Sequence, residues 1–521
     1  MSLDPWLLAL DLGTQSVRAL LIDLQGNIRG KAQHAFDDYV SLHDGWHEHD
    51  ADTFWQAAAG VCRRVLQDHA HEHAAERVQG ITVTTQRGTL LPVDAAGQPL
   101  RRFITWLDQR RASRLPPISP LWRLAFKAAG VAPTIDYFQR EAELNWIAEH
   151  EPEVLARTHK VLLVSGWLNF RLTGRYADSV ASQVGYLPFD FKRQQWAGER
   201  DWKWQALTVK RDWLPELLPA GETIGGLTRE AAAATGLREG LPVIAAAADK
   251  ACEIVGAGAI APHIGALSYG TTATIDVTTP RYVEALSFIP PYPAMLPGQY
   301  NTEVQIFRGY WLVRWFKDQF GHPEIAEALA AGVSPEALFD RLVAQVPPGS
   351  QGLMLQPYWT PGIRHPGPDA RGAVIGFSDV HTRAHLYRAI LEGLAYALRE
   401  GTERIEKRSG TSITELRVSG GGAQSDAAMQ LTADIFGLPA ARPHTFETSG
   451  LGAAIAGAVG LKLYADFPAA VAGMTRLGRR FEPDPRHRAL YDALYHGTYQ
   501  RMYGRLAPLY AQLRKVLKTS G

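Results

Sequence analysis

The stretch Trp6-Leu7-Leu8-Ala9-Leu10-Asp11-Leu12-Gly13-Thr14 decides the fold of this chain. Its apolar run predicts a buried strand, Gly13-Thr14 predicts a tight turn, and the apolar residues 17–22 predict a second strand. Gly26-Asn27 predicts a further turn with a third strand after it. Helical apolar spacing follows over residues 52–66, and helix and strand patterns then alternate. Hairpins followed by such an alternation indicate an α/β domain with a mixed sheet.

The opening stretch recurs about half a chain later. Ala9-Leu10-Asp11-Leu12-Gly13-Thr14 aligns with Ala266-Leu267-Ser268-Tyr269-Gly270-Thr271, with four identities in six positions. Each copy leads into more strand-like sequence, residues 17–22 in one case and 273–277 in the other. The repeat predicts two α/β halves of related topology, joined near residues 258–265. A ligand is expected in the cleft between two such halves.

Composition limits the functional class. The chain has 521 residues, 46% of them hydrophobic, and its 54 basic and 53 acidic residues leave a net charge of +1. This balance argues against electrostatic binding to nucleic acid or a membrane surface. Two cysteines, Cys62 and Cys252, exclude a disulfide scaffold, and no run of about 18 apolar residues is present. We therefore expect a soluble cytoplasmic protein with no nucleic-acid or membrane partner.

Several turns carry residues suited to phosphate chemistry. Gly13-Thr14 and Gly270-Thr271-Thr272 would each offer backbone N–H groups and hydroxyls to an anion. Asp11, at a strand end, is suited to holding Mg²⁺ through water. The glycine-rich residues 419–425 lie between a predicted strand and a predicted helix and are suited to contact a nucleotide. The alternative interpretation of the two Gly-Thr turns is that they are ordinary hairpin turns.

Asp249 is the candidate general base. It follows the apolar run 243–248, and a carboxylate at such a strand end often points into a cleft. The alternative is that Asp249 caps the helix that follows. Gly256 and Gly258 fit a dinucleotide pattern, but the residues before them indicate a helix instead of the required strand, and His69, His71 and His73 lack helical metal spacing. No P-loop motif is present.

Taken together, these motifs resemble the FGGY family of carbohydrate kinases. The resemblance spans nearly the whole chain, and the order and spacing of its motifs carry it. They are residues 10–14 with Arg18, residues 45–50, 105–111, 172–174 with Asp178, 248–258, 269–272, 371–376, 385–393 and 420–422.

The resemblance implies two actin-like, ribonuclease-H-like domains with an interdomain cleft, a sugar-binding domain at 1–258 and an ATP-binding domain at 259–521. It implies Asp249 as the catalytic base and Asp11 at the Mg²⁺–phosphate position. The residues that it places around ATP and its phosphates are Gly13, Thr14, Arg18, Gly270, Thr271, Thr272, Gly421, Gly422 and Ser425.

The implied reaction is transfer of the γ-phosphate of ATP to a sugar hydroxyl. Asp249 would accept the hydroxyl proton while Mg²⁺ and backbone donors neutralise the phosphoryl oxygens. Around the sugar we expect Gln86, Arg87, Trp106, Asp108, Asp249 and Lys250: Trp106 would stack on a carbon chain, and Arg87 and Asp108 would bond to hydroxyls.

Two departures bear on the substrate. Gln86-Arg87 resembles glycerol kinases, which have a polyol-binding glutamate where Gly88 stands, so Gly88 leaves room for a larger substrate. Lys250 follows the base where many family members have Asn or Gln; it would lower the pKa of Asp249 or pair with a substrate carboxylate.

A ketopentose such as xylulose is the first expectation, and a polyol or a sugar acid (glycerol-, erythritol- or gluconate-like) is the alternative. From another class, the chain would be a catalytically silent actin-like ATP-binding regulator. A homodimer is expected by analogy with the family.

Overall fold

The computed structural model describes residues 3–36, 39–333, 335–362 and 365–519. It contains two compact units, and neither is continuous in sequence. The first comprises Met1–Gly258, Tyr292–Tyr300 and Glu447–Thr475, and the second comprises Ala259–Pro291, Asn301–Phe446 and Arg476–Gly521. The expected division into 1–258 and 259–521 has a single boundary. In the structure, two segments of the second half, Tyr292–Tyr300 and Glu447–Thr475, belong to the first unit.

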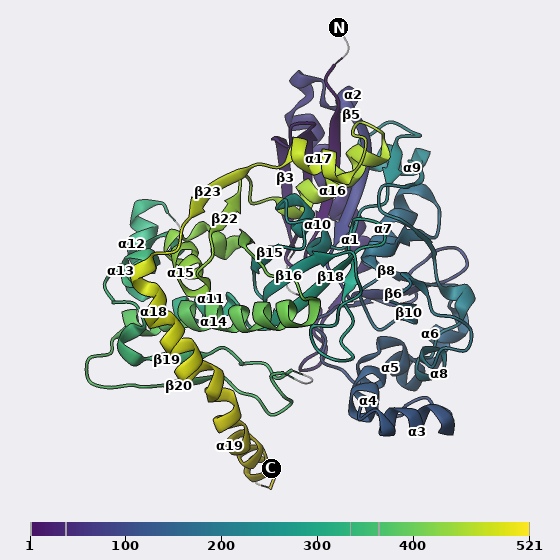
Figure 1. Cartoon of the computed structure of the whole chain (residues 1–521). Helices are drawn as coiled ribbons and strands as arrows, with labels where there is room; N and C mark the ends of the chain where they lie inside the picture. The colour runs from purple at the N-terminus through teal and green to yellow at the C-terminus, as the bar shows by residue number, and fades with distance from the viewer. Residues whose placement is uncertain (1–2, 37–38, 334, 363–364, 520–521) are drawn as a thin grey trace. The chain divides into compact units, whose positions relative to one another are not determined.

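The first unit is built on a six-stranded mixed sheet (Figure 1). Its order is β13 (Thr223–Gly226), β14 (Pro242–Ile244), β5 (Val78–Thr85), β1 (Trp6–Leu12), β2 (Ser16–Asp23) and β3 (Ile28–Ala35). β1 runs antiparallel to β2 and parallel to β5, and β5 runs parallel to β14. The predicted strand, turn, strand, turn, strand order at the N-terminus is confirmed. Every residue of β1 is buried, as its apolar sequence predicts.

Helices and smaller sheets complete this unit. A four-stranded sheet has the order β4 (Glu48–His49), β7 (Phe103–Ile104), β6 (Leu90–Val93) and β8 (Lys160–Leu163). Two-stranded pairs join β9 (Ala177–Ser179) to β12 (Glu216–Leu218) and β10 (Phe189–Asp190) to β11 (Gln195–Trp196). The helices are α1 (Ala51–Asp68), α2 (Ala74–Arg77), α3 (Pro120–Ala128), α4 (Ala132–Glu141), α5 (Glu143–His150), α6 (Pro152–Arg157), α7 (Val164–Thr173), α8 (Lys203–Ala206), α9 (Arg229–Thr235), α10 (Asp249–Gly256), α16 (Thr448–Gly460) and α17 (Phe467–Met474).

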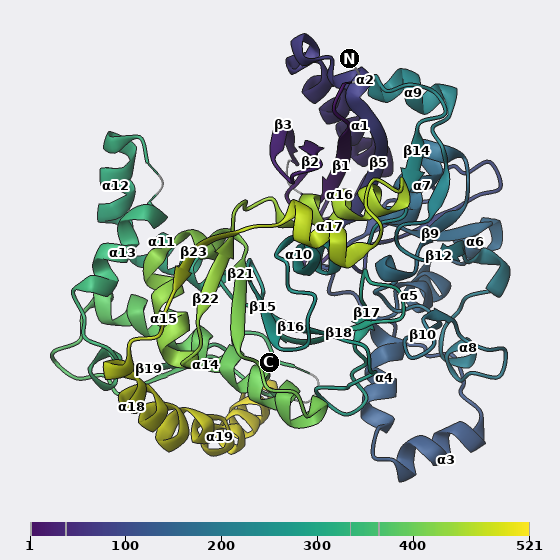
Figure 2. The ribbon, with the colours of Figure 1, turned by 45° about the horizontal axis from the view of Figure 1, so that its top comes forward.

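The helix α16 comes from the second half of the sequence and packs against α10 in the first unit. Figures 1 and 2 both show α16 beside α10. The two backbones approach very closely, because a Cβ on Gly256 would overlap the carbonyl of Thr448 and a Cβ on Gly452 would overlap that of Cys252. Small residues are therefore required at this crossing, as the small-residue composition of α16 predicts. The contact fixes α10, whose first residue is Asp249.

The second unit repeats the arrangement of the first sheet. Its strands run in the order β18 (Tyr300–Ile306), β16 (Ala273–Thr279), β15 (Ile264–Tyr269), β21 (Glu415–Ser419), β22 (Ala440–Pro443) and β23 (Leu477–Phe481). The short strand β17 (Tyr292–Pro293) lies in a segment of the first unit. β15 is antiparallel to β16 and parallel to β21, as β1 is to β2 and β5. β21 is parallel to β22, and the edge strand β23 is antiparallel, as in β5, β14 and β13. The predicted repeat is confirmed at the level of sheet topology.

Helices cover the second unit. These helices are α11 (Trp311–Phe320), α12 (His322–Ala331), α13 (Glu336–Ala344), α14 (Arg383–Ser409), α15 (Asp426–Phe436), α18 (Pro485–Leu494) and α19 (Gln500–Thr519). The unit also has the short strands β19 (Met354–Gln356) and β20 (Ala373–Ile375).

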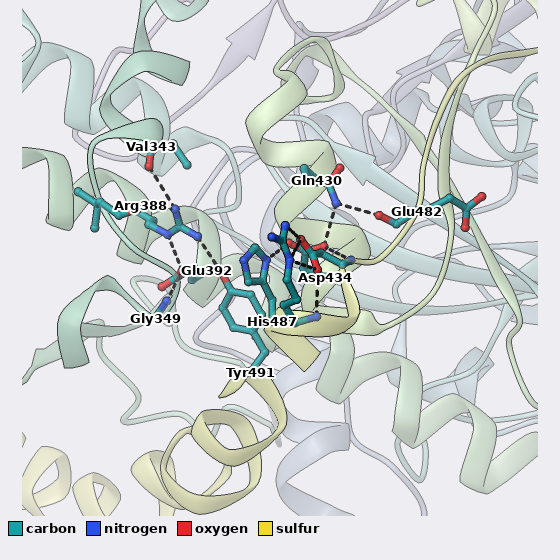
Figure 3. Close-up of polar contacts among 12 residues, drawn as sticks. Val343, Gly349, Arg388, Glu392, Gln430, Asp434, Glu482, His487 and Tyr491 are labelled. Atoms are coloured by element: carbon teal, nitrogen blue, oxygen red, sulfur yellow. Dashed lines mark hydrogen bonds and ion pairs between the residues drawn. The ribbon is translucent and has the colours of Figure 1, made fainter. Parts of the chain in front are cut away.

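A buried polar cluster joins helices of the second unit. On α14, Arg388 Nε donates to Glu392 at 2.8 Å, and the hydroxyl of Tyr491 on α18 donates to the same carboxylate at 2.9 Å. Figure 3 shows this contact beside the His487–Asp434 pair, which ties α18 to α15.

None of the helices in the described part of the chain is long and apolar enough to cross a membrane.

Candidate active site

The predicted site residues of the first unit follow three neighbouring strands. Leu12 of β1 lies beside Thr85 of β5, and Ile244 of β14 lies beside Thr82. Because these strands are parallel, their carboxyl ends meet at one edge of the sheet. Gly13 and Thr14 follow β1, Gln86 and Arg87 follow β5, and Asp249 follows β14 at the start of α10. The sheet register thus brings together residues that lie more than 200 positions apart.

Asp249 is a partly buried acid at the start of α10. Its Oδ1 accepts a hydrogen bond from the backbone N–H of Lys250 at 2.8 Å. Burial raises its pKa from the ordinary value of 3.8, and the charges of Arg87 and Lys250 oppose that shift without reversing it. The helix N-cap is Ala248, so Asp249 does not occupy the capping position that the alternative interpretation gave it. A partly buried carboxylate with a raised pKa is suited to general-base catalysis.

The ammonium of Lys250 has a partner within the protein. Its Nζ donates to Glu253 Oε2 at 2.8 Å, one helical turn further along α10. Lys250 does lower the pKa of Asp249, as the sequence predicts, although burial outweighs it. Its charge is balanced by Glu253, so Lys250 alone gives no reason to expect an anionic substrate.

Asp11 lies among charged neighbours at the end of β1. Asp11 is only 6% exposed, and its Oδ2 lies 3.4 Å from Arg18 NH1. Burial raises the pKa of Asp11 to about 7; Arg18 opposes this shift, and the negative charges of Asp249, Glu447 and Glu253 add to it. Such a concentration of negative charge favours a divalent cation.

The residues around Asp11 fit a Mg²⁺ ion that is bound through water. Over the described ranges of the chain, no group of three or more His, Cys, Asp or Glu side chains could hold a metal directly. Mg²⁺ commonly keeps several waters and is held by one or two carboxylates together with substrate phosphates. Asp11 suits that mode, which is the water-mediated contact expected from the sequence.

Arg18 is held by a residue that the sequence reading missed. Its NH1 donates to Glu447 Oε2 at 3.1 Å, and Lys31 pairs with the other oxygen of Glu447. Glu447 is the N-cap residue of α16, so it reaches the first unit with that helix. No sequence pattern near Arg18 indicates this partner, because 429 positions separate the two residues.

Thr14, Gln86 and Trp106 form a continuous set of hydrogen bonds. The indole Nε1 of Trp106 donates to Thr14 Oγ1 at 2.9 Å, and Thr14 Oγ1 donates to Gln86 Oε1 at 3.0 Å. The Nε2 of Gln86 has no hydrogen-bond partner among the described residues, although Gln86 is only 4% exposed. Thr14, which is expected at the phosphate, thus contacts Gln86 and Trp106, which are expected at the sugar.

Asp108 and Gly88 are two further positions near Trp106: the first has a carboxylate that is already hydrogen-bonded, and the second has no side chain. The carboxylate of Asp108 accepts from the backbone N–H of His47 at 2.7 Å and from the Arg110 guanidinium at 2.7 and 2.8 Å, and its side chain is 3% exposed. Asp108 therefore orders the local loop, and its acceptor sites are in use. A Cβ on Gly88 would lie 3.6 Å from Cβ of Trp106, so Gly88 lies beside the Trp106 side chain.

The second unit presents its predicted phosphate turn through the backbone. The N–H of Gly270 bonds to the carbonyl of Thr272 at 3.1 Å, which closes the turn between β15 and β16. Tyr310 N and Gly309 N donate to the carbonyls of Gly270 and Thr271, each at 3.0 Å. The side chain of Thr271 is exposed.

The glycine-rich turn after β21 lies against an aromatic stack. A Cβ on Gly422 would overlap the ring of Tyr310, which stacks on Tyr269 with 4.4 Å between centroids. Ser425 caps α15 by accepting from Ala428 N, and its hydroxyl donates to Asp340 Oδ1 at 2.5 Å. The sequence reading also missed Tyr310 and Asp340, since neither lies in a recognisable motif.

Comparisons with known proteins agree with this architecture. Residues 6–256 match the N-terminal domain of the FGGY family of carbohydrate kinases, and residues 265–461 match its C-terminal domain. The chain belongs to the FGGY family. Members are phosphotransferases with an alcohol acceptor, and they use ATP as the phosphate donor.

Related enzymes differ in substrate. The chain is 31% identical to the glycerol kinase of Dechloromonas aromatica over 96% of its own length and 97% of that enzyme. It is 28% identical to the xylulose kinase of Lactococcus lactis, over 98% of both chains. The crystal structure of the xylulose kinase from Rhodospirillum rubrum superposes with a TM-score of 0.81 at 28% identity, covering 97% of this chain and all of that one. The expected two-domain, actin-like kinase fold is confirmed.

Proposed function

We propose that this FGGY kinase transfers the γ-phosphate of ATP to a hydroxyl of a small neutral sugar, with a ketopentose such as xylulose as the first candidate. The observation that carries the proposal is Asp249, a partly buried carboxylate with a raised pKa that follows β14 beside Gln86 and Arg87. Pure nucleotide binding gives no role to such a base. This feature argues against the alternative of a silent ATP-binding regulator.

In the proposed reaction Asp249 accepts the proton of the substrate hydroxyl. The hydroxyl oxygen forms a bond to the γ-phosphorus while the bond from that phosphorus to the bridging oxygen breaks, and ADP leaves. Arg87 is held near Asp249, with its guanidinium 5.0 Å above the ring of Tyr292. General-base assistance is worth about 10²–10⁴-fold, so positioning must supply much of the remaining acceleration.

The phosphate contacts are proposed on both units. In the turns at Gly13-Thr14 and Gly270-Thr271-Thr272, the glycine N–H groups bond within the turn, so the N–H groups of the threonines would meet phosphate oxygens, with Arg18 beside the first turn. Gly421, Gly422 and Ser425 would lie along the adenosine. Asp11 would hold Mg²⁺ through water, and the ion would neutralise charge on the phosphates.

The substrate choice rests on two positions in the first unit. Gly88 lies beside Trp106 and has no side chain of its own, which favours a chain longer than glycerol. The Lys250–Glu253 pair removes the reason to prefer a sugar acid. A polyol substrate is the second candidate, because the glycerol kinase of Dechloromonas aromatica is 31% identical to this chain. A homodimer and a cytoplasmic location stay predictions.

An ADP-release assay with the full chain tests the proposal. Mg²⁺-ATP is offered with D-xylulose, other ketopentoses, hexuloses, glycerol, erythritol and D-gluconate, and Asp249→Ala is measured alongside. We expect one neutral sugar to raise ADP release well above background, and the variant to lose that response. Stimulation by D-gluconate alone would contradict the neutral-sugar assignment. ATP binding without stimulation by any sugar would favour the silent regulator.

A further inference from the structure

We infer that Glu447 is a positioning residue for Arg18: its carboxylate holds the Arg18 guanidinium where it meets a phosphate of ATP and keeps it from pairing closely with Asp11. The inference rests on the proposed kinase function and adds to it a residue from the second half of the sequence. All three residues belong to the first unit.

Four charged side chains of alternating sign meet on one face of the first sheet. Asp11 on β1 is paired in register with Arg18 on β2, and Lys31 on β3 is paired with Leu20. Because Leu20 lies two positions from Arg18, Lys31 and Arg18 project from the same face. Glu447 places one carboxylate oxygen on each cation: Oε2 accepts from Arg18 NH1 at 3.1 Å, and Oε1 pairs with Lys31. Arg18 therefore lies between two carboxylates.

Close packing of α16 on β2 determines where Glu447 lies. A Cβ on Gly450 would lie 2.1 Å from Cδ1 of Leu20, so the first turn of α16 rests directly on β2. Glu447 is the N-cap residue of this helix, but its side chain makes no capping hydrogen bond. The side chain is only 16% exposed. Its carboxylate is thus engaged by the two cations of the sheet and not by its own helix.

The two carboxylates hold Arg18 unequally. Arg18 NH1 lies 3.1 Å from Glu447 and 3.4 Å from Asp11, so the closer contact is with Glu447. Loss of Glu447 would leave Asp11 as the one carboxylate in the described part of the chain that contacts Arg18. The guanidinium would then be drawn toward Asp11, where Mg²⁺ is proposed to bind through water.

The geometry leaves part of the guanidinium for a ligand. Both ion pairs use NH1, and the Arg18 side chain is 35% exposed, so NH2 is left to donate to a phosphate oxygen. A guanidinium that is already held in position loses less freedom when the nucleotide binds. The Glu447 contact therefore acts on nucleotide affinity through the position of Arg18.

Binding of the non-hydrolysable analogue AMP-PNP with Mg²⁺ to the full chain, measured by calorimetry, tests this role without a sugar. Glu447→Met should raise the Kd about tenfold, as expected for loss of a charged hydrogen-bond partner. Glu447→Gln keeps an acceptor oxygen without the charge, so its Kd should fall between those of wild type and Glu447→Met. Lys31→Met is the matched control: it removes the other partner of the same carboxylate and should leave the Kd within about twofold.

A double-mutant cycle separates positioning from a role in holding α16. Arg18→Met should itself raise the Kd, and adding Glu447→Met should raise it no further, because Glu447 acts through Arg18. Equal fold increases from Glu447→Met in both backgrounds would show that Glu447 acts through the helix, and would overturn the inference. A Kd raised as much in Lys31→Met as in Glu447→Met would also overturn it.

Controls keep the inference distinct from the proposed function. Thermal unfolding shows whether each variant is folded, and if Glu447→Met is not, the same cycle with Glu447→Gln decides. An unchanged Kd in a folded Glu447→Met would overturn the inference. Absence of sugar-dependent turnover in wild type would contradict the sugar-kinase assignment, whereas the AMP-PNP cycle would still decide the role of Glu447. Failure of wild type to bind AMP-PNP would overturn both.

Discussion

The two Gly-Thr turns share a topology but differ in charge. At the end of β1, Asp11 is paired in register with Arg18, whereas at the end of β15 the same position is occupied by Ser268, paired with Thr274. The parallel neighbour of β1 leads into Gln86 and Arg87, while the parallel neighbour of β15 leads into three glycines, Gly420–Gly422. One fold therefore supports two different chemical surfaces.

This difference indicates which unit binds the sugar and which unit binds the nucleotide. The strand ends of the first unit carry carboxylates, a guanidinium and an amide, which are the groups that move protons and bind hydroxyls. The strand ends of the second unit present backbone and aromatic faces, which suit close approach of a nucleotide. Substitutions at Asp249, Gln86 and Arg87 in the first unit should act on kcat and the sugar KM, and those at the glycine-rich turn of the second unit should act on nucleotide affinity.

The largest effect is expected at Asp249. Asp249→Asn keeps the shape of the side chain but cannot accept the hydroxyl proton, so kcat should fall by about 10²–10⁴-fold. The Kd of mant-ADP should stay within about twofold of wild type, because the base belongs to the sugar side. A loss of mant-ADP binding equal to the loss of kcat would contradict the division between the two units.

The pH dependence of kcat should follow the same carboxylate. Asp249 must be ionised to act as a base, so kcat falls as the pH drops through its pKa. Burial raises that pKa above 3.8, which places the acid limb at higher pH than for an exposed aspartate. Arg87 lowers the pKa, so Arg87→Gln should move the limb to still higher pH. The measurement is the acid limb of log kcat against pH; a shift to lower pH in Arg87→Gln would contradict the assignment.

The sequence predicted the repeat and the strand-end positions, because apolar runs and Gly-Thr turns are local signals. Asp249 and the turn at Gly13-Thr14 follow strands, as predicted. The partners of these residues were not predictable. Glu447 reaches Arg18 only because α16 packs on α10, and Asp108 is engaged by Arg110 through the shape of one loop. Hydrogen-bond direction in the Trp106–Thr14–Gln86 set likewise requires coordinates.

Gly422→Ala tests the aromatic surface of the second unit. A Cβ at this position would overlap the ring of Tyr310 and displace it from its stack on Tyr269. We expect the Kd of mant-ADP to rise about tenfold, corresponding to about 1.4 kcal/mol. Gly421→Ala is the matched control, because a Cβ there meets nothing within 4 Å and should change the Kd little. A larger effect at Gly421 than at Gly422 would mean that the nucleotide, and not Tyr310, requires the glycine.

The smallest effect is expected at Thr271, the counterpart of Thr14 in the repeat. Its side chain is exposed, so its hydroxyl is available to donate to a phosphate oxygen. Thr271→Val should therefore raise the ATP KM by about three- to tenfold, as expected for one lost hydrogen bond, and leave the sugar KM unchanged. Thr271→Ser, which keeps the hydroxyl, should behave as wild type. A raised sugar KM with an unchanged ATP KM in Thr271→Val would contradict a phosphate contact for this hydroxyl.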